Sequence, residues 1–311
     1  MQFQIKQSTI NQVAFIQLQD IELGVTIEIL AKGALLNSWL LSQGGESHQF
    51  IMGNDLNATM EFESQGFRSA KMSPYVCRLY KGQYAHLNTT YTMDRFYMGE
   101  HAIHGIMYDA DFIVQATEAN EHQAVVILVH HYLGSDQGYP FPFTMHVKWI
   151  LEKNNKVSVQ TTILNDATIP IPVVDGWHPY FTLGESINNC TLQFSSKGKM
   201  EYDSDLLPTG NIIEDARFSN GFKIGTLQLD DGYELDTENS ICTLQNEQFI
   251  LKILPSSLYP YLQLYIPPDR NSIAIENLSG APNAFNNKMG LQIVKPQNNI
   301  VFETSYQLVV K

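Results

Sequence analysis

A histidine flanked by aromatic residues is the first feature of this sequence that could carry out chemistry. The segment 175–181 reads Asp-Gly-Trp-His-Pro-Tyr-Phe, and places His178 between a glycine and a proline that interrupt regular structure. An imidazole can donate or accept a proton near neutral pH. The rings of Trp177 and Tyr180 supply flat apolar surfaces of the kind on which a sugar ring stacks. We therefore expect His178 where a strand runs into a loop, and the pattern equally fits a buried histidine at a β-corner.

Two further segments place basic side chains among apolar residues. Arg78 follows Cys77 in an apolar run, where an unpaired buried charge is very costly. Its planar guanidinium suits two neighbouring hydroxyls or a carboxylate, so a ligand and a structural salt bridge are both compatible with it. His101 and His104 are three residues apart, but no HExxH-like box accompanies them, and we expect no metal. His104, followed by a glycine, is expected either to bind a ligand hydroxyl or to face solvent in a turn.

A carboxylate completes the set of candidates. Glu276 ends an alternating apolar segment, 273–276, and precedes a loop rich in Gly, Pro and Asn. A carboxylate held at the mouth of a β structure by a rigid strand is well placed to act as a general base, although an edge carboxylate that limits aggregation gives the same pattern. The sequence contains no GxSxG, GxGxxG or GxxxxGK[ST] motif. Paired carboxylates for glycoside hydrolysis stay open, because their separation is a three-dimensional quantity.

The elements that would position these side chains are predicted to be β-strands. Alternation predicts a hairpin between 147 and 163 with its turn at 153–156, and an opening hairpin that turns at 8–11. The Asp-Asp-Gly sequence at 230–232 predicts another turn. No window longer than about ten residues has a helical apolar stripe. Together these patterns predict an all-β sandwich, and we expect one domain over residues 1–311. Further strands are expected at 25–29, 249–254, 262–266 and 301–310.

Composition limits the possible partners. The 311 residues are 44% hydrophobic and 16% charged, with a net charge of −13 and no basic run, which argues against nucleic acid. No apolar segment approaches the ~20 residues needed to cross a membrane, and residues 1–22 do not resemble a signal peptide. The three cysteines form no CxxC pair, so we expect reduced thiols in a cytoplasmic protein.

Taken in order, these segments resemble the aldose 1-epimerase (galactose mutarotase) family over roughly residues 25 to 296. Each motif is short, and their order and spacing carry the resemblance. The matching pieces are Gly33-Ala34, residues 73–79 with 81–84 behind them, His104-Gly105 with Tyr108-Asp109 and Phe112, and residues 138–140, 176–181, 207–210 and 275–286.

The resemblance implies a large antiparallel β-supersandwich with a sugar in an open cleft and no metal or organic cofactor. It implies that Glu276 is the catalytic base and His178 the catalytic acid, and that Arg78 and His104 bind the sugar. The family also has a substrate-binding aspartate three residues before an aromatic. Asp230, before Tyr233, fits this spacing best, and Asp231 is the alternative. Trp177 or Tyr180 would supply a stacking face for the sugar.

The implied reaction exchanges the α and β anomers of an aldohexose by opening and closing the hemiacetal ring. For this we expect Glu276 ionised and His178 able to donate a proton when the sugar binds. Two departures from the family pattern, Cys77 before the arginine and Asn277 after the glutamate, leave the sugar preference open. A hexose-6-phosphate 1-epimerase, with Arg68 and Lys71 as further cations, and a non-catalytic carbohydrate-binding protein are the alternatives. We expect a monomer or homodimer.

Overall fold

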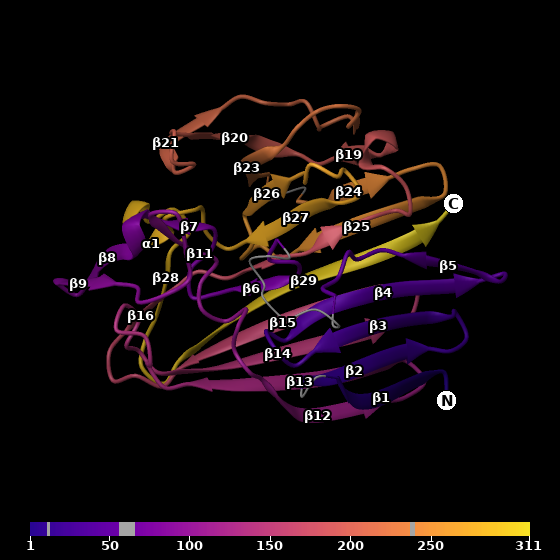
Figure 1. Cartoon of the computed structure of the whole chain (residues 1–311), viewed down its shortest axis with the longest axis horizontal. Helices are drawn as coiled ribbons and strands as arrows, with labels where there is room; N and C mark the ends of the chain where they lie inside the picture. The colour runs from indigo at the N-terminus through magenta and orange to yellow at the C-terminus, as the bar shows by residue number, and fades with distance from the viewer. Residues whose placement is uncertain (11–12, 56–65, 237–239) are drawn as a thin grey trace.

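Antiparallel strands make up almost all of the regular secondary structure (Figure 1). The computed structural model describes residues 1–10, 13–55, 66–236 and 240–311. Within these ranges the helices are short, namely α1 (Ala284–Asn287) and two 3-10 turns, Tyr80–Gly82 and Ile187–Asn189. None of these described helices is long and apolar enough to span a membrane. The predicted all-β supersandwich is confirmed.

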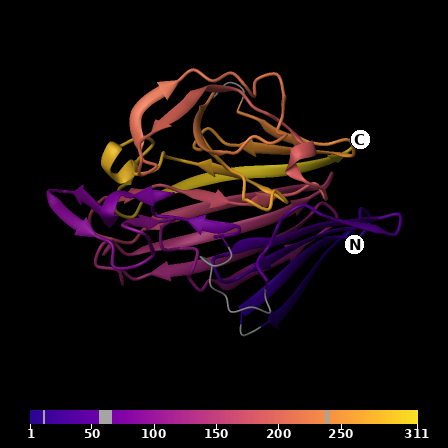
Figure 2. The same cartoon turned by 45° about the horizontal axis from the view of Figure 1, so that its top comes forward.

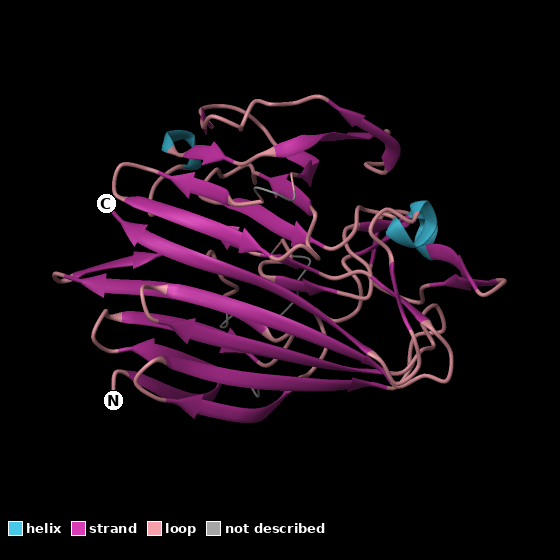
Figure 3. Ribbon diagram, turned by 180° about the vertical axis from the view of Figure 1, so that it is seen from behind, coloured by secondary structure: helices cyan, strands magenta, loops and turns pink. Residues whose placement is uncertain are grey.

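The longest strands form a nine-stranded sheet, which faces the viewer in Figure 3. Its alternating apolar residues face inward, and its central strands run side by side for most of the width of the molecule. In spatial order this sheet contains β12 (Ile113–Ala119), β13 (Gln123–Tyr132), β14 (Phe143–Glu152), β15 (Lys156–Asn165), β29 (Asn299–Val310), β25 (Phe249–Pro255), β24 (Cys242–Gln245), β19 (Thr191–Gln193) and β22 (Phe222–Lys223).

Two further sheets cover the inner face of this layer. The first is a five-stranded meander of β1 (Phe3–Ile10), β2 (Val13–Asp20), β3 (Val25–Leu30), β4 (Leu35–Gln43) and β5 (Glu46–Gln49). The second contains β21 (Pro208–Ile213), β20 (Ser196–Tyr202), β23 (Asp230–Leu235), β26 (Tyr261–Tyr265), β27 (Ile273–Leu278), β17 (Gly176–His178) and β6 (Ala70–Met72), with β18 (Tyr180–Phe181) also paired to β27. We call this second sheet the site sheet. Figure 2 shows its β20–β21 hairpin at the top of the molecule.

Buried tryptophans join the layers. Trp149 on β14 donates its indole N–H to the Ala34 carbonyl at 2.8 Å and packs edge-on against Trp177, with ring centroids 5.2 Å apart. Each buried indole removes a large apolar surface from water, and the Trp149 N–H also has a hydrogen-bond partner. These contacts tie the nine-stranded sheet to the five-stranded sheet and to the site sheet.

Short strand groups stand beside one end of the sheets (Figure 1). They comprise β7 (Arg78–Leu79), β10 (Tyr97–Met98) and β11 (His101–Ile103) in one small sheet, the hairpin of β8 (Gln83–His86) and β9 (Thr89–Thr92), and the pair of β16 (Ile171–Val173) and β28 (Gln292–Val294).

The predicted hairpins are present, but the predicted turn at 230–232 is wrong. The strands on both sides of 153–156 pair in register. β1 and β2 also pair, but the turn predicted at 8–11 is misplaced, because residues 8–10 belong to β1 and 11–12 lie outside the described residues. Asp230, Asp231 and Gly232 instead begin strand β23. A Cβ on Gly232 would come within 2.1 Å of the Tyr202 hydroxyl, so this glycine makes room for a side chain and does not mark a turn.

A left-handed pair of residues directs His104 toward the site sheet. His104 has φ of 58° and Gly105 has φ of 75°, a conformation that only glycine adopts without cost. The backbone of Gly105 also lies directly against Ser73, where an added Cβ would be 2.2 Å from the carbonyl oxygen.

We predict that Gly105→Ala lowers the free energy of unfolding by roughly 2–4 kcal/mol, because it combines an unfavourable φ with a backbone clash. Gly99→Ala is the matched control, since Gly99 has φ of 62° with no atom within 4 Å of an added Cβ. That variant should lose only about 1 kcal/mol. Urea unfolding measures both, and equal losses would contradict the role assigned to the contact with Ser73.

Candidate active site

Strand register brings the candidate residues together on one face of the site sheet. Glu276 on β27 lies opposite Gln263 on β26, and Gln263 lies opposite Gly232 on β23. Since alternate residues of a strand point to the same face, Asp230, two positions before Gly232, shares this face. His178 reaches it from β17, which pairs with β27 on one side and β6 on the other.

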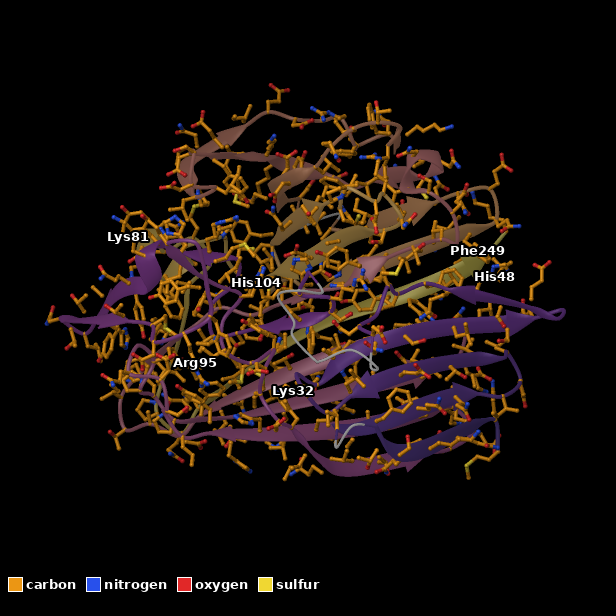
Figure 4. The ribbon with its side chains drawn as sticks, viewed as in Figure 1. Lys32, His48, Lys81, Arg95, His104 and Phe249 are labelled. Carbon is orange, nitrogen blue, oxygen red and sulfur yellow. The ribbon has the colours of Figure 1, made fainter. Side chains whose placement is uncertain are left out.

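This face forms the floor of a cavity of about 290 Å³, near the lower end of the range of roughly 300–1,000 Å³ typical of ligand pockets. Loops from the small β7–β10–β11 sheet and the β20–β21 turn form its walls. Figure 4 shows His104 near the middle of the molecule, whereas Lys81 lies at its periphery. The cavity is lined by Gly66, Phe67, Cys77, Arg78, Met98, Ile103, His104, His178, Tyr180, Tyr202, Leu206, Asp230, Gln263, Tyr265, Glu276 and Pro282.

His178 and Glu276 meet at the cavity floor. Nε2 of His178 lies 3.1 Å from Oε1 of Glu276, and the two side chains are 7% and 2% exposed. The second carboxylate oxygen, Oε2, and the ring nitrogen Nδ1 have no hydrogen-bond partner among the described residues. Both atoms are themselves buried, so each is an unsatisfied polar atom beneath the cavity floor. Glu276 lies inside strand β27, which continues to Leu278, so the expectation that it ends a strand, and the edge-carboxylate interpretation, are wrong.

Aromatic rings hold the imidazole of His178 in place. Tyr180 stacks on one face of His178 with ring centroids 4.9 Å apart, and the His104 ring meets it edge-on at 5.1 Å. His104 is itself packed edge-on against Phe67 and has its Nδ1 3.0 Å from the sulfur of Met72. The site thus presents a histidine whose ring orientation is fixed by packing before any ligand arrives.

Burial shifts the pKa values of the pair in opposite directions. It lowers the pKa of His178 from 6.5 to about 4. It raises the pKa of Glu276 well above its usual value, and the negative charge of Asp230 adds to this rise. Both shifts arise because a low-dielectric environment disfavours the charged form of each group. Burial therefore favours a protonated carboxyl and a neutral imidazole, which differs from the ionised Glu276 expected from sequence.

A protonated carboxyl beside a neutral imidazole carries the same number of protons as a carboxylate beside an imidazolium. A proton moving between Oε1 and Nε2 converts one arrangement into the other without changing the net charge of the site. The pair can therefore take a proton from one atom of a ligand while it donates a proton to a neighbouring atom of that ligand.

Arg78 and Asp230 provide opposite charges on the cavity wall. No ion pair or side-chain hydrogen bond of Arg78 with another described residue is seen, so its fork of donors faces the cavity. Asp230 is accessible from the cavity, and its Oδ1 accepts a hydrogen bond from Gln263 at 3.0 Å. Partial desolvation raises the pKa of Asp230, and the positive charge of Arg78 opposes that rise. Both groups are placed to bind polar groups of a ligand in the cavity.

Three of the expected residues lie elsewhere or are arranged differently. Trp177 points away from the cavity into the core, where the ammonium of Lys71 lies 4.3 Å from its ring centroid, because adjacent residues of a strand face opposite sides. Asp231 likewise points away from Asp230 and pairs with Lys199 at 2.6 Å. Tyr180 lines the cavity, but one of its faces is covered by His178.

Sequence reasoning missed Gln263 and Tyr202. Gln263 is 6% exposed, accepts a hydrogen bond from the Tyr202 hydroxyl at 2.8 Å and donates to Asp230. It thereby links a tyrosine, an aspartate and the strand next to Glu276. The available signal was a single amide in the otherwise apolar segment 261–265, since a buried polar side chain in a strand requires a partner.

Comparison with solved structures places this architecture among galactose mutarotase-like folds. A galactose mutarotase-like protein from Clostridium acetobutylicum superposes with a TM-score of 0.86 at 18% identity, covering 100% of this chain and 99% of that one. A galactose 1-epimerase from Lactobacillus acidophilus NCFM superposes with a TM-score of 0.84 at 18% identity, covering 99% of each chain. At this identity the likeness establishes the fold.

The sequence model of the aldose 1-epimerase family matches residues 16–307, and the chain therefore belongs to this family. Among curated proteins, the uncharacterized protein YihR of Escherichia coli K12 is 25% identical over 232 residues, which cover 71% of this chain and 73% of YihR. The family resemblance inferred from the short motifs is confirmed.

The shifted pKa of His178 predicts a pH-dependent stability. Between pH 6.5 and about 4 the unfolded chain binds a proton at His178 that the folded protein does not, so the stability supplied by the neutral imidazole is lost as pH falls through this window. At ~1.4 kcal/mol per pH unit the loss reaches about 3 kcal/mol. In His178→Gln the free energy of unfolding should fall less steeply over this range.

Urea unfolding at several pH values between 7 and 4 measures the difference between the two proteins. His122→Gln is the matched control, because His122 is exposed, and its profile should run parallel to that of the wild type. A His178→Gln profile that also ran parallel would contradict the buried, neutral state of His178.

Proposed function

We propose that the protein is an aldose 1-epimerase that interconverts the α and β anomers of a hexose. The observation that carries this proposal is the buried contact of His178 with Glu276, 3.1 Å apart on the floor of a cavity sized for a small ligand. The hydroxyl oxygen O1 and the ring oxygen O5 of an aldopyranose share one carbon atom. Two groups that exchange protons with these oxygens must therefore lie side by side, as these do.

Ring opening uses the ionised arrangement of the pair. The carboxylate of Glu276 removes the proton from O1, the bond between C1 and O5 breaks, and the imidazolium of His178 gives its proton to O5. The products are an open-chain aldehyde, a protonated carboxyl and a neutral imidazole. This is the arrangement that burial favours, so the environment stabilises the state of the enzyme that accompanies the open intermediate.

Ring closure reverses the proton transfers on the other face of the aldehyde. After rotation about C1–C2, the neutral imidazole takes the proton of the O5 hydroxyl while O5 attacks C1, and Glu276 returns its proton to O1. No net proton is released, so the pair is ready for another cycle. Each positioned transfer contributes roughly 10²–10⁴-fold.

The remaining wall groups have roles in holding the sugar and orienting the imidazole. Arg78, Asp230 and His104 grip hydroxyls away from C1, which leaves the aldehyde free to rotate. Gln263 holds the Asp230 carboxylate. Tyr180 stacks on His178 and supports its ring. The face of Tyr180 that covers His178 is therefore not available to the sugar.

The charge of the cavity favours a neutral sugar over a 6-phosphate. Lys71, one of the cations considered for a phosphate, is fully buried and paired with Asp175. Arg68 donates Nη1 to the Gly53 carbonyl at 3.0 Å and does not line the cavity. Among the described lining residues Arg78 is the single cation and faces Asp230, which leaves little excess positive charge for a phosphate dianion.

We predict that Glu276→Gln and His178→Asn fold normally and each lower the mutarotation rate at least ~10²-fold. Polarimetry of a freshly dissolved α-anomer measures the rate. Asp231→Asn is the matched control, because Asp231 bears the same carboxylate next to Asp230 but points out of the cavity, and it should keep the wild-type rate. Near-normal rates in both pair variants would overturn the assignment.

We further predict that neutral aldohexoses are turned over with a higher kcat/KM than their 6-phosphates. A panel of both, followed by exchange NMR under identical conditions, decides this. Faster turnover of a 6-phosphate would establish the alternative epimerase, and binding of sugars without any acceleration would establish a carbohydrate-binding protein.

A further inference from the structure

A buried ion pair lies on the face of the site sheet opposite the cavity. Nζ of Lys71 and Oδ2 of Asp175 are 2.5 Å apart, and both side chains are 0% exposed. The hydroxyl of Tyr259 donates to the same carboxylate oxygen at 2.7 Å. The Lys71 ammonium also lies over the ring of Trp177. Two charges, a phenol and an indole are thus packed together in the core, where they cannot touch a ligand in the cavity.

This cluster joins the strands that carry the proposed acid and base. Asp175 immediately precedes β17, which ends at His178. Lys71 lies on β6 and is the cross-strand partner of Trp177 on β17. Asp175 is tied to β27 twice, since its N–H donates to the hydroxyl of Ser279 and its carbonyl accepts from the Ser279 N–H, both at 2.8 Å. Ser279 follows Glu276 by three residues.

The regular ladder between β17 and β27 is short. The two strands share a single residue pair, Gly176 with Leu278. Pro179 has no N–H to donate, although its carbonyl accepts a hydrogen bond from the Ile275 N–H at 3.3 Å, and residue pairing with β27 resumes at Tyr180 on β18. The position of His178 relative to Glu276 therefore depends in part on contacts other than this short ladder.

We propose that Lys71 and Asp175 are positioning residues, whose ion pair holds β17 against β6 and β27 so that His178 meets Glu276. Their effect on the reaction rests on the proposed epimerase function. A buried ion pair adds little net stability over apolar residues of similar volume. The ion pair does fix the relative position of the strands. Its 2.5 Å contact, together with the Tyr259 hydroxyl that donates to the same carboxylate oxygen, tolerates little displacement of either strand.

The test is the double variant Lys71→Met/Asp175→Asn, which removes both charges and keeps an acceptor oxygen for Tyr259. We expect a folded protein in which kcat falls about 10- to 100-fold, because small misplacements of catalytic groups are costly, while KM changes less than about twofold. Lys197→Met/Glu234→Gln, which removes an exposed ion pair of the same sheet, should keep the wild-type kcat.

A second readout follows His178 directly. NMR titration of its imidazole should show the pKa moving from its depressed value toward the ordinary one in the double variant, since a loosened strand exposes the ring to water. This measurement does not require turnover. If the wild type accelerates no mutarotation, the proposed function fails, and the titration still tests the positioning role.

Ser279→Ala supplies a milder variant should the double variant not fold. It removes one hydrogen bond between Asp175 and β27 and should lower kcat several-fold with KM unchanged and the same direction of change in the His178 titration. The proposal would be overturned if the folded double variant kept the wild-type kcat and an unchanged His178 titration. If only Ser279→Ala folds, the same two results in that variant would overturn it.

Discussion

Burial of two ionisable side chains against each other is the constraint on which the site depends. Water normally stabilises an imidazolium and a carboxylate separately, and the cavity floor denies this stabilisation to both His178 and Glu276. Each pKa shift alone would leave the charged form, the imidazolium of His178 or the carboxylate of Glu276, sparsely populated. Because the two groups are in contact, the cost of creating the charges is reduced by their mutual attraction in a poorly screened environment. The pair can therefore exist in two proton arrangements with the same net charge.

The sheet makes this contact possible because it gives each strand two chemically different faces. On β17, His178 faces the cavity while Trp177 faces the core, and on β23, Asp230 faces the cavity while Asp231 faces away. The apolar and charged groups on the far face hold the strands, and those on the near face line the cavity. A single slip in register would exchange the two sets.

Much of the fold and part of the site follow from local sequence patterns. Alternation and turn residues predict the hairpin of β14 and β15, and breaks in periodicity mark the segments of Arg78, His104 and His178. The same signals do not reveal which strands become neighbours. Gln263 therefore went unnoticed, because its significance comes from lying opposite Glu276, which is a property of register between distant segments.

The errors have the same physical origin. An Asp-Gly pair favours a turn when nothing else acts on it, but at Gly232 the tertiary requirement for space beside Tyr202 decides the conformation. Trp177 was a reasonable stacking surface by residue type, and the alternation of β17 assigns it to the core. Alternation also determines that Trp177 and His178 cannot both face one cavity, so this part of the site was predictable once a strand was assumed.

Under the proposed function, reversibility sets a further demand on the pair. The two anomers of a sugar differ little in free energy, so a catalyst that favoured one proton arrangement strongly would be trapped in it. Burial favours the uncharged arrangement, whereas the polar hydroxyls of a bound sugar would favour the charged one. The desolvated floor and the polar ligand thus act in opposite directions on the same proton. That opposition brings the two arrangements closer in energy only while the sugar is present.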